Sequence, residues 1–181
     1  AVGVLEELGA EIVEVAIPLA YEARNNSIAA EGPVWLRDNF PEEVLREWEE
    51  LHPALERGEN QSFADYLHGQ QKRMAIRQEA IAVLKQVDVI VMPTGSTIGD
   101  TWDATTAIIR GRTVPARSRA VYLNGMASQT GLPAVSIPCG FAKEGRFPVG
   151  LQLVGRDLEE GLLLRLAYAY EQAAGWHKMH P

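Results

Sequence analysis

The sequence has one cysteine, no long apolar run and little basic charge. Cys139 cannot form a disulfide within the chain, which predicts a reducing compartment and a cytoplasmic protein. No uninterrupted apolar run approaches the roughly 20 residues of a membrane span, so we expect no membrane partner. The net charge of −7 argues against a nucleic-acid partner. The one local basic cluster, four arginines between positions 110 and 119, is interpreted as solvated loop charge.

Residue types that support metal or nucleophilic catalysis are also sparse. Of four histidines, only His177 and His180 lie close together, and they fall in an expected C-terminal tail. We therefore expect no metal site and no cofactor. Cys139 has no histidine near it in the sequence, so we interpret it as a structural thiol rather than a nucleophile. No Ser/His/Asp set is supported by spacing.

The most informative stretch runs from Asn124 to Val154. It holds two short apolar runs, residues 134–137 and 149–154, each preceded by a proline and separated by a connection with turn-forming glycines. This pattern predicts a strand, a connection of roughly ten residues and a second strand in a buried sheet. Gly131 and Gly140 are expected at backbone positions that a side chain would hinder.

Helix signals surround this strand pair. Ser62 is expected to start the longest helix, which runs to about residue 86 with one buried stripe. The expected stripe consists of Phe63, Tyr66, Leu67, Met74, Ile76, Ala80, Ile81, Val83 and Leu84. A final helix is expected from Asp157 to Gly175.

Less regular segments are expected between these elements. A helix over residues 19–28 is interrupted at 31–33, and another begins near Pro41 and ends at His52-Pro53. The chain opens with the last turns of a helix that stops at Gly9, and a short strand over residues 12–15 follows. Residues 94–122 show no convincing periodicity and are expected to form a long loop.

These elements predict the fold class. Strand 88–92 is apolar throughout, as expected for a strand covered on both faces. Alternation of helices with such strands predicts an α/β fold with a mixed β-sheet flanked by helices. At 181 residues the chain has room for a single domain, residues 1–181.

Three motifs resemble the C-terminal part of the amidase signature family, in the order that the family has them. They are VDVIVMPT at 87–94, GLPAVSIPCG followed by PVGLQLVG at 131–140 and 148–155, and LLLRLAYAYEQ at 162–172. They cover about half of the chain, and LEELGAEIVEVAIP at 5–18 resembles a further element that follows the family's catalytic core. The resemblance implies that the chain is a C-terminal fragment of a larger amidase-like domain.

The family's chemistry implies more residues than these. Members of the family hydrolyse amides through a Ser–cis-Ser–Lys triad and a backbone oxyanion hole. In the triad, a neutral lysine activates one serine by taking its proton through the other serine. The lysines here are Lys72, Lys85, Lys143 and Lys178, and none belongs to a Ser-x-x-Lys or accompanies a Gly/Ser-rich loop. We therefore predict no catalytic residue in these 181 residues and expect the triad upstream of them.

A substrate-binding contribution is still expected. In open α/β sheets, ligands bind beyond the carboxyl ends of strands, which indicates Thr94 and Gly95 after the first predicted strand. Ser128 and Gln129 lie in a predicted turn before the strand at Gly131, and the resemblance places both loops near the acyl pocket. The implied partner is a small-molecule amide, once the chain is joined to an upstream catalytic part.

Three functional alternatives remain open. The chain is part of a general amidase, part of a protein like the glutamyl-tRNA amidotransferase A subunit, or a non-catalytic module that binds a partner or self-associates into a homo-oligomer through a sheet edge. The amidotransferase protein has an aspartate for its glutamine substrate where an ungapped match here places Val121. That difference favours the general amidase.

Overall fold

The computed structural model describes residues 1–22, 28–98, 103–109, 111–116, 123–142 and 147–179. The α-helices are α1 Val2–Glu7, α2 Ile28–Asn39, α3 Glu42–Glu47, α4 His52–Glu59, α5 Phe63–Leu84, α6 Asn124–Thr130 and α7 Glu160–Ala174. The strands are β1 Ile90–Pro93, β2 Thr106–Ile109, β3 Arg112–Pro115, β4 Ala134–Ala142 and β5 Phe147–Val154. Short 3-10 helices are η1 Pro18–Glu22, η2 Glu49–Leu51 and η5 Trp176–Lys178.

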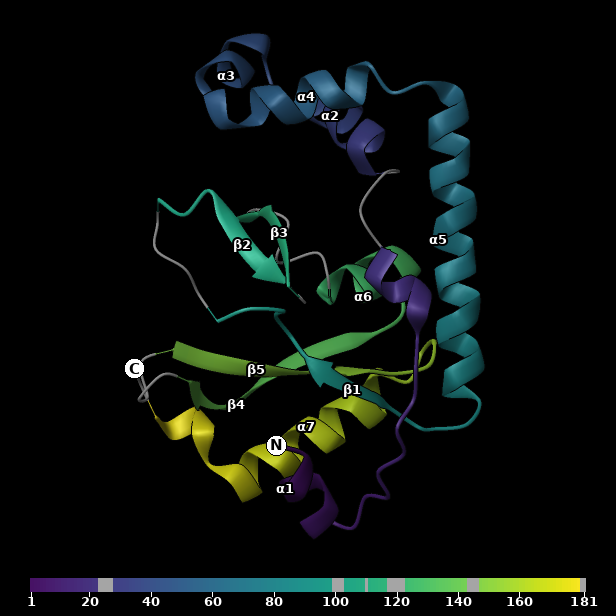
Figure 1. The fold of residues 1–181 in the computed structure, drawn as a ribbon, viewed down its shortest axis with the longest axis vertical. Coiled ribbons are helices and arrows are strands. Elements are labelled where there is room, and N and C mark those ends of the chain that lie inside the picture. Colours follow the sequence, from purple (N-terminus) through teal and green to yellow (C-terminus); the bar gives the residue numbers. More distant parts are fainter. Residues whose placement is uncertain (23–27, 99–102, 110, 117–122, 143–146, 180–181) are drawn as a thin grey trace.

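A three-stranded sheet with the order β1-β5-β4 lies at the centre of the lower half of the molecule (Figure 1). β5 is the middle strand, and it pairs antiparallel with both neighbours, so that Leu153 lies between Val91 and Val135. β4 and β5 form the predicted strand pair, which is longer than expected. A bulge interrupts their register between Pro138 and Gly140, and Gly140 has a φ of +139°. The α/β class predicted from the sequence is confirmed, and the described strands of this sheet all pair antiparallel.

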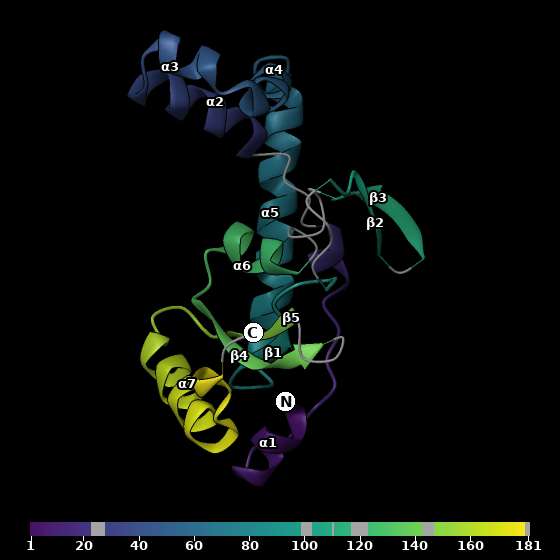
Figure 2. The same cartoon turned by 90° about the vertical axis from the view of Figure 1, so that its left-hand side faces the viewer.

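Each face of the sheet carries its own hydrophobic core, because successive strand residues point to opposite faces. Leu151 and Leu153 pack with α7 and α1, and this core also contains Leu5, Leu163 and Tyr170. The other core joins β1 and β5 to the C-terminal half of α5, to α6 and to Ile17; its buried members are Ile17, Ile76, Ala80, Val83, Leu84, Ile90, Met126, Leu132 and Val154. Figure 2 shows α7 and α1 together at the end of the molecule opposite α2–α4.

Local signals predicted several helix ends correctly. The Ser62 hydroxyl accepts a hydrogen bond from the Asp65 N–H at 3.1 Å and so caps α5 at its predicted start. α7 ends at Gly175, whose φ of +70° suits glycine, and Gly9 follows α1 with a φ of +91°. Gly131 likewise ends α6 in the left-handed conformation.

The predicted buried stripe of α5 is only half correct. Ile76, Ala80 and the last turns of the helix are buried, whereas Phe63, Leu67 and Met74 are exposed. Phe63 and Leu67 belong to the upper half of α5, which in Figure 1 extends beyond the sheet towards α2–α4. Met74 precedes Ile76 by two residues, about 200° around the helix, and so lies on the opposite face.

Helices α2, α3 and α4 form an acidic helical arm, residues 28–61, at the top of Figure 1. Two proline predictions are wrong here. Pro33 lies inside α2 instead of interrupting it, and its buried ring offsets the lost backbone hydrogen bond by packing. Pro53 starts α4 instead of ending a helix, because a proline in the first turn has no N–H to leave unsatisfied.

Three predictions for the connecting segments are also corrected. Residues 12–15 form no strand, since no described strand pairs with them, although Val15 and Ile17 pack into a core. The expected loop 94–122 contains the β2–β3 hairpin, which turns at Gly111 with a φ of +74°; residues 99–102, 110 and 117–122 lie outside the described part. The helix expected over 19–28 is the short η1, with residues 23–27 likewise not described.

Candidate functional site

Hydroxyl groups from two strands meet at the carboxyl end of β1. Thr94 directly follows β1, and its N–H donates to the Gly150 carbonyl at 2.8 Å, which continues the ladder to β5. Ser136 lies on β4, across β5 from Thr94. The two hydroxyl oxygens, Thr94 Oγ1 and Ser136 Oγ, lie 2.6 Å apart and hydrogen bond each other. All three strands of the sheet therefore contribute to one spot on its surface.

Gly150 makes this hydrogen bond sterically feasible. A Cβ atom at position 150 would lie 2.7 Å from Thr94 Oγ1 and 2.8 Å from Ser136 Oγ. Those separations are shorter than van der Waals contact, so a side chain on β5 would push the two hydroxyls apart. A glycine inside a strand indicates such a close approach, and it is the sequence signal that could have located the hydroxyl pair.

A cavity of about 620 Å³ opens over this spot. Its lining residues are Thr94, Gly95, Ser96, Thr97, Ile98, Ser136, Ile137, Pro138, Pro148, Val149 and Gly150. The volume falls in the range of small-molecule sites. The two residues predicted after β1, Thr94 and Gly95, therefore lie together in a cavity, whereas Ser136 and Gly150 were not predicted.

The other two predicted site residues lie elsewhere. Ser128 and Gln129 belong to α6 rather than to a turn, and neither lines the cavity at Thr94. The Ser128 hydroxyl is exposed and donates to the Asn124 carbonyl at 3.3 Å. Gln129 is buried, and its main-chain carbonyl accepts a hydrogen bond from Arg73 Nε at 2.5 Å. This bond ties the C-terminal end of α6 to α5.

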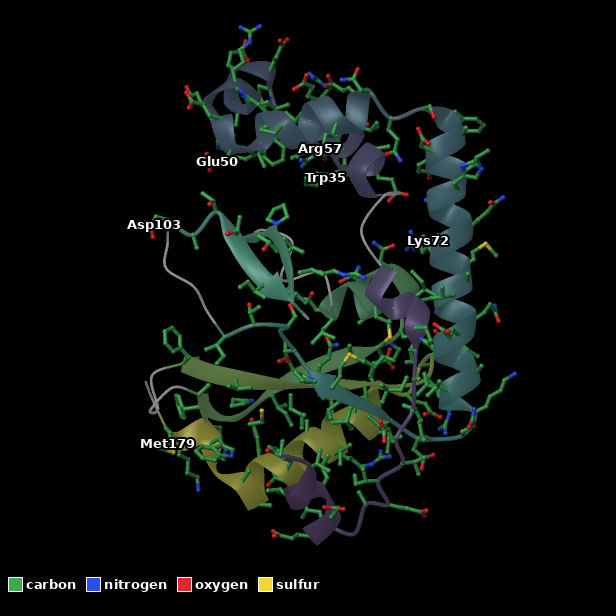
Figure 3. All side chains as sticks on the ribbon, viewed as in Figure 1. Trp35, Glu50, Arg57, Lys72, Asp103 and Met179 are labelled. Atoms are coloured by element: carbon green, nitrogen blue, oxygen red, sulfur yellow. The ribbon has the colours of Figure 1, made fainter. Side chains whose placement is uncertain are left out.

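Among the described residues, the ionisable groups near the sheet do not form a nucleophilic set. Burial raises the pKa of the Cys139 thiol, which keeps it protonated at neutral pH and unreactive. Lys72 lies midway along α5, between the acidic arm and the sheet (Figure 3). Within the described ranges, no three His, Cys, Asp or Glu side chains cluster as a metal site would require. No helix in the same ranges combines the length and apolarity of a membrane span.

The family model for amidases matches residues 1–164. The chain belongs to the amidase signature family. Among curated relatives, this amidase-family chain is 34% identical to the A subunit of glutamyl-tRNA(Gln) amidotransferase from a Cyanothece species, with 98% of the chain and 41% of the relative covered. It is 33% identical to an amidase of Pseudomonas putida over 100% of the chain and 39% of that protein.

Solved amidase-family structures share the fold. A crystal structure of an amidase superposes with a TM-score of 0.78 and 28% identity, covering 94% of this chain and 39% of the other. An allophanate hydrolase of Kluyveromyces lactis gives a TM-score of 0.70 and 26% identity, covering 96% and 28%. Nearly all of this chain matches these two curated relatives, and it spans about two-fifths of the length of each.

Proposed function

We propose that this chain is the C-terminal portion of an amidase-signature amidohydrolase that hydrolyses a carboxamide C–N bond. Its role in that enzyme is to complete the sheet and to form one wall of the substrate pocket. The observation that carries the proposal is the cavity at the end of β1, with the Thr94–Ser136 hydroxyl pair over Gly150 at its floor. Thr94 and Gly95 are the proposed substrate-binding residues in this cavity.

The chemistry divides between this chain and the triad. Amide hydrolysis by this family requires an activated serine and donors for the developing oxyanion, which we place in sequence outside these 181 residues. The present residues contribute positioning, which holds the scissile carbonyl close to the nucleophile and lowers the entropic part of the barrier. Ser128 and Gln129 would contact only a substrate that extends from the cavity to α6, and their binding role is part of the proposal.

A second candidate is a protein like the glutamyl-tRNA amidotransferase A subunit. The 34% identity to the Cyanothece subunit over 98% of the chain supports this second candidate. The 33% identity to the P. putida amidase supports the general amidase equally well. Position 121, where the sequence difference lies, is outside the described residues. The candidates separate by substrate, since an amidotransferase requires glutamine and a general amidase does not. The non-catalytic alternative predicts no turnover in any context.

A chimera tests the proposal. Residues 1–181 replace the matching segment of the P. putida amidase, so that the relative supplies the serines and the lysine. We expect no amide hydrolysis by the chain alone and turnover by the chimera, with labelling of its serine by a fluorophosphonate probe. Thr94→Ala should raise KM in the chimera more than it lowers kcat, and Ser128→Ala tests the α6 contact in the same assay.

A chimera that folds and reacts with the probe, yet hydrolyses neither simple amides nor glutamine, would contradict the proposal. Turnover of glutamine in preference to aryl and aliphatic amides would instead establish the second candidate. Probe labelling of the 181-residue chain itself would reveal a nucleophile within it.

A further inference from the structure

One face of α5 points away from the rest of the molecule. In Figure 1 the helix forms the right-hand edge, with the acidic arm and the sheet both on its left. Nine of the ten residues on this side are exposed, whereas the buried Ile76 and Ala80 lie on the opposite side. The outer face of α5 consists of Phe63, Ala64, Leu67, His68, Gln71, Met74, Ala75, Gln78, Ile81 and Ala82.

This outer face has no aspartate, glutamate, lysine or arginine. The helix does contain such residues, and all of them lie outside the face: Asp65, Lys72, Arg73, Arg77 and Glu79. A helix face that stays in water usually carries charged side chains. Depletion of charge together with Phe, Leu and Met is instead typical of the centre of a protein–protein interface. The composition of the outer face therefore indicates that another protein surface covers it.

The spacing of the residues indicates what kind of surface this is. Six of them follow one another at alternating intervals of three and four positions, which is the heptad pattern of helices that pack side by side. They extend for about 26 Å along the helix axis. These six residues are Ala64, Leu67, Gln71, Met74, Gln78 and Ile81.

We propose that the outer face of α5 binds the same face of a second copy of this chain, with the two α5 helices antiparallel. In that orientation each larger apolar side chain meets a small side chain or an amide, so that the two surfaces are complementary in shape. The pairs are Ala64 with Ile81, Leu67 with Gln78 and Gln71 with Met74 of the partner subunit. The glutamines pack through their methylene groups, and their amides reach water at the edge of the pair.

Charge at the two ends of α5 selects the antiparallel orientation. The acidic arm, which precedes α5, has nine acidic and three basic side chains. A parallel pair would place two such arms side by side, and they would repel each other. In the antiparallel pair each arm lies beside the C-terminal end of the other α5, where the exposed Lys85 falls opposite Asn60 of the partner subunit. Attraction between Lys85 and the acidic arm then replaces repulsion.

Sedimentation equilibrium of the 181-residue chain tests the dimer. We expect the mean mass to rise from 19.9 kDa at about 1 µM towards twice that value at about 300 µM. The contact runs along a single helix, so it is smaller than most stable interfaces, and we expect a Kd of about 10–100 µM. A mass that stays at that of the monomer over the whole range would overturn the proposal.

Charged substitutions locate the contact. Leu67→Lys and Met74→Lys should each weaken self-association at least about tenfold, because a lysine would lose water without gaining a partner. Leu164→Lys is the matched control, since Leu164 is 61% exposed on α7, away from this face. All three variants should keep the wild-type circular dichroism spectrum at about 1 µM, where the chain is monomeric. Wild-type association in both α5 variants, or its loss in Leu164→Lys, would refute the assignment to α5.

Disulfide cross-linking tests the orientation. In a Cys139→Ser background, one chain carries Leu67→Cys and another carries Gln78→Cys. Positions 67 and 78 meet in the antiparallel pair, whereas two copies of position 67 lie about 16 Å apart along the axis, too far for a disulfide. We expect cross-linked dimer from the mixture of the two chains and none from either chain alone. Cross-linking of either chain with itself would contradict the antiparallel arrangement.

The dimer and the proposed function can fail separately. Self-association requires no catalytic triad, so an inactive chimera leaves the dimer proposal intact. A chain that remains monomeric removes only the dimer, because the cavity at Thr94 does not include any residue of α5.

Discussion

At Gly150 the sheet has no room for a side chain. The strand residue itself makes no polar side-chain contact, yet its missing Cβ determines whether Thr94 and Ser136 can hydrogen bond above it. A site can thus depend on a residue that contributes no functional group.

Gly150→Ala should destabilise the fold by about 1–3 kcal/mol, because the new methyl group overlaps two oxygen atoms. Gly32→Ala is the matched control, since a Cβ there meets nothing within 4 Å and alanine favours the helix. It should leave stability unchanged or raise it by up to about 1 kcal/mol. Urea unfolding measures the stability of both variants. Equal stability would show that the Thr94 and Ser136 hydroxyls move apart at little cost in free energy.

Tyr170 is another residue whose environment yields a prediction. Its side chain is fully buried, and its hydroxyl has no hydrogen-bond partner among the described residues. Burial, with a smaller effect of nearby Cys139, raises the pKa of the phenol. Tyr170→Phe should therefore raise stability or leave it unchanged, because it removes an unsatisfied buried group.

The pH dependence follows from the sign of the Tyr170 pKa shift. A raised folded-state pKa means that the folded protein holds this proton more tightly, so its stability contribution is present below about pH 10 and is lost above it. Above about pH 10 the wild type should lose stability with rising pH more steeply than Tyr170→Phe, in which Cys139 is unchanged. A marked loss of stability in the variant at neutral pH would mean that the hydroxyl has an acceptor.

At the scale of elements, α5 shows two different environments along one helix. Its lower half packs against the core with Ile90 and Val154, and its upper half connects to the acidic arm. The apolar residues of the two halves also face differently, since Phe63 and Leu67 lie on another side of the helix than the buried Ile76 and Ala80.

Matched alanine substitutions near the middle of α5 should separate its two faces. Ile76 is 1% exposed and Met74 is 65% exposed, two residues apart on the same helix. Ile76→Ala should cost about 2–5 kcal/mol through the lost burial and the cavity it leaves. Met74→Ala should change the unfolding free energy by less than about 0.5 kcal/mol. A comparable cost at both positions would show that the face of α5 that carries Met74 is covered in solution.

The hairpin β2–β3 should be the least protected of the described strands. It pairs two strands only, and its buried cluster consists of Ala107, Ile109 and Val114. β5, in contrast, is paired on both sides and carries residues of both cores. Native-state hydrogen exchange should be faster at Ile108 and Thr113 than at Leu151 and Leu153. Equal protection would imply that something else packs on the hairpin.

At the scale of the whole molecule, charge is distributed unevenly. The acidic arm contains nine acidic and three basic side chains, a net charge of −6 out of the total of −7. Trp35, Glu50 and Arg57 mark this arm in Figure 3, at the opposite end of the molecule from Met179. Its exposed ion pairs, Arg37–Glu59 and Arg46–Glu42, neutralise only part of the repulsion.

Salt should therefore stabilise the chain. Raising NaCl from about 20 to about 300 mM at neutral pH should increase Tm by about 2 °C or more, because screening weakens repulsion between like charges at the arm. The gain should shrink near about pH 4.5, where the carboxylates are partly protonated. Thermal unfolding followed by circular dichroism measures this, and a Tm that falls with salt at neutral pH would show that attractive ion pairs dominate.

The sequence alone determined the features that depend on near neighbours. Ser62 caps α5, and Gly131, Gly140 and Gly175 take backbone conformations that other residues rarely adopt. The family motifs likewise indicated the sheet and the amidase family, since they record strand and turn chemistry within short segments. Thr94 and Gly95 were located by the same logic, as residues at the end of a strand.

Only the tertiary structure decided which distant residues meet. Thr94 and Ser136 are 42 positions apart, and their contact depends on the register of both β1 and β4 against β5. Ser128 and Gln129 are closer to Ser136 in sequence, yet they belong to α6 and do not line the cavity. Pro33 stays in α2 because its ring is buried, a condition that no local pattern records. Register and burial are properties of several segments together, and for that reason one segment's sequence does not determine them.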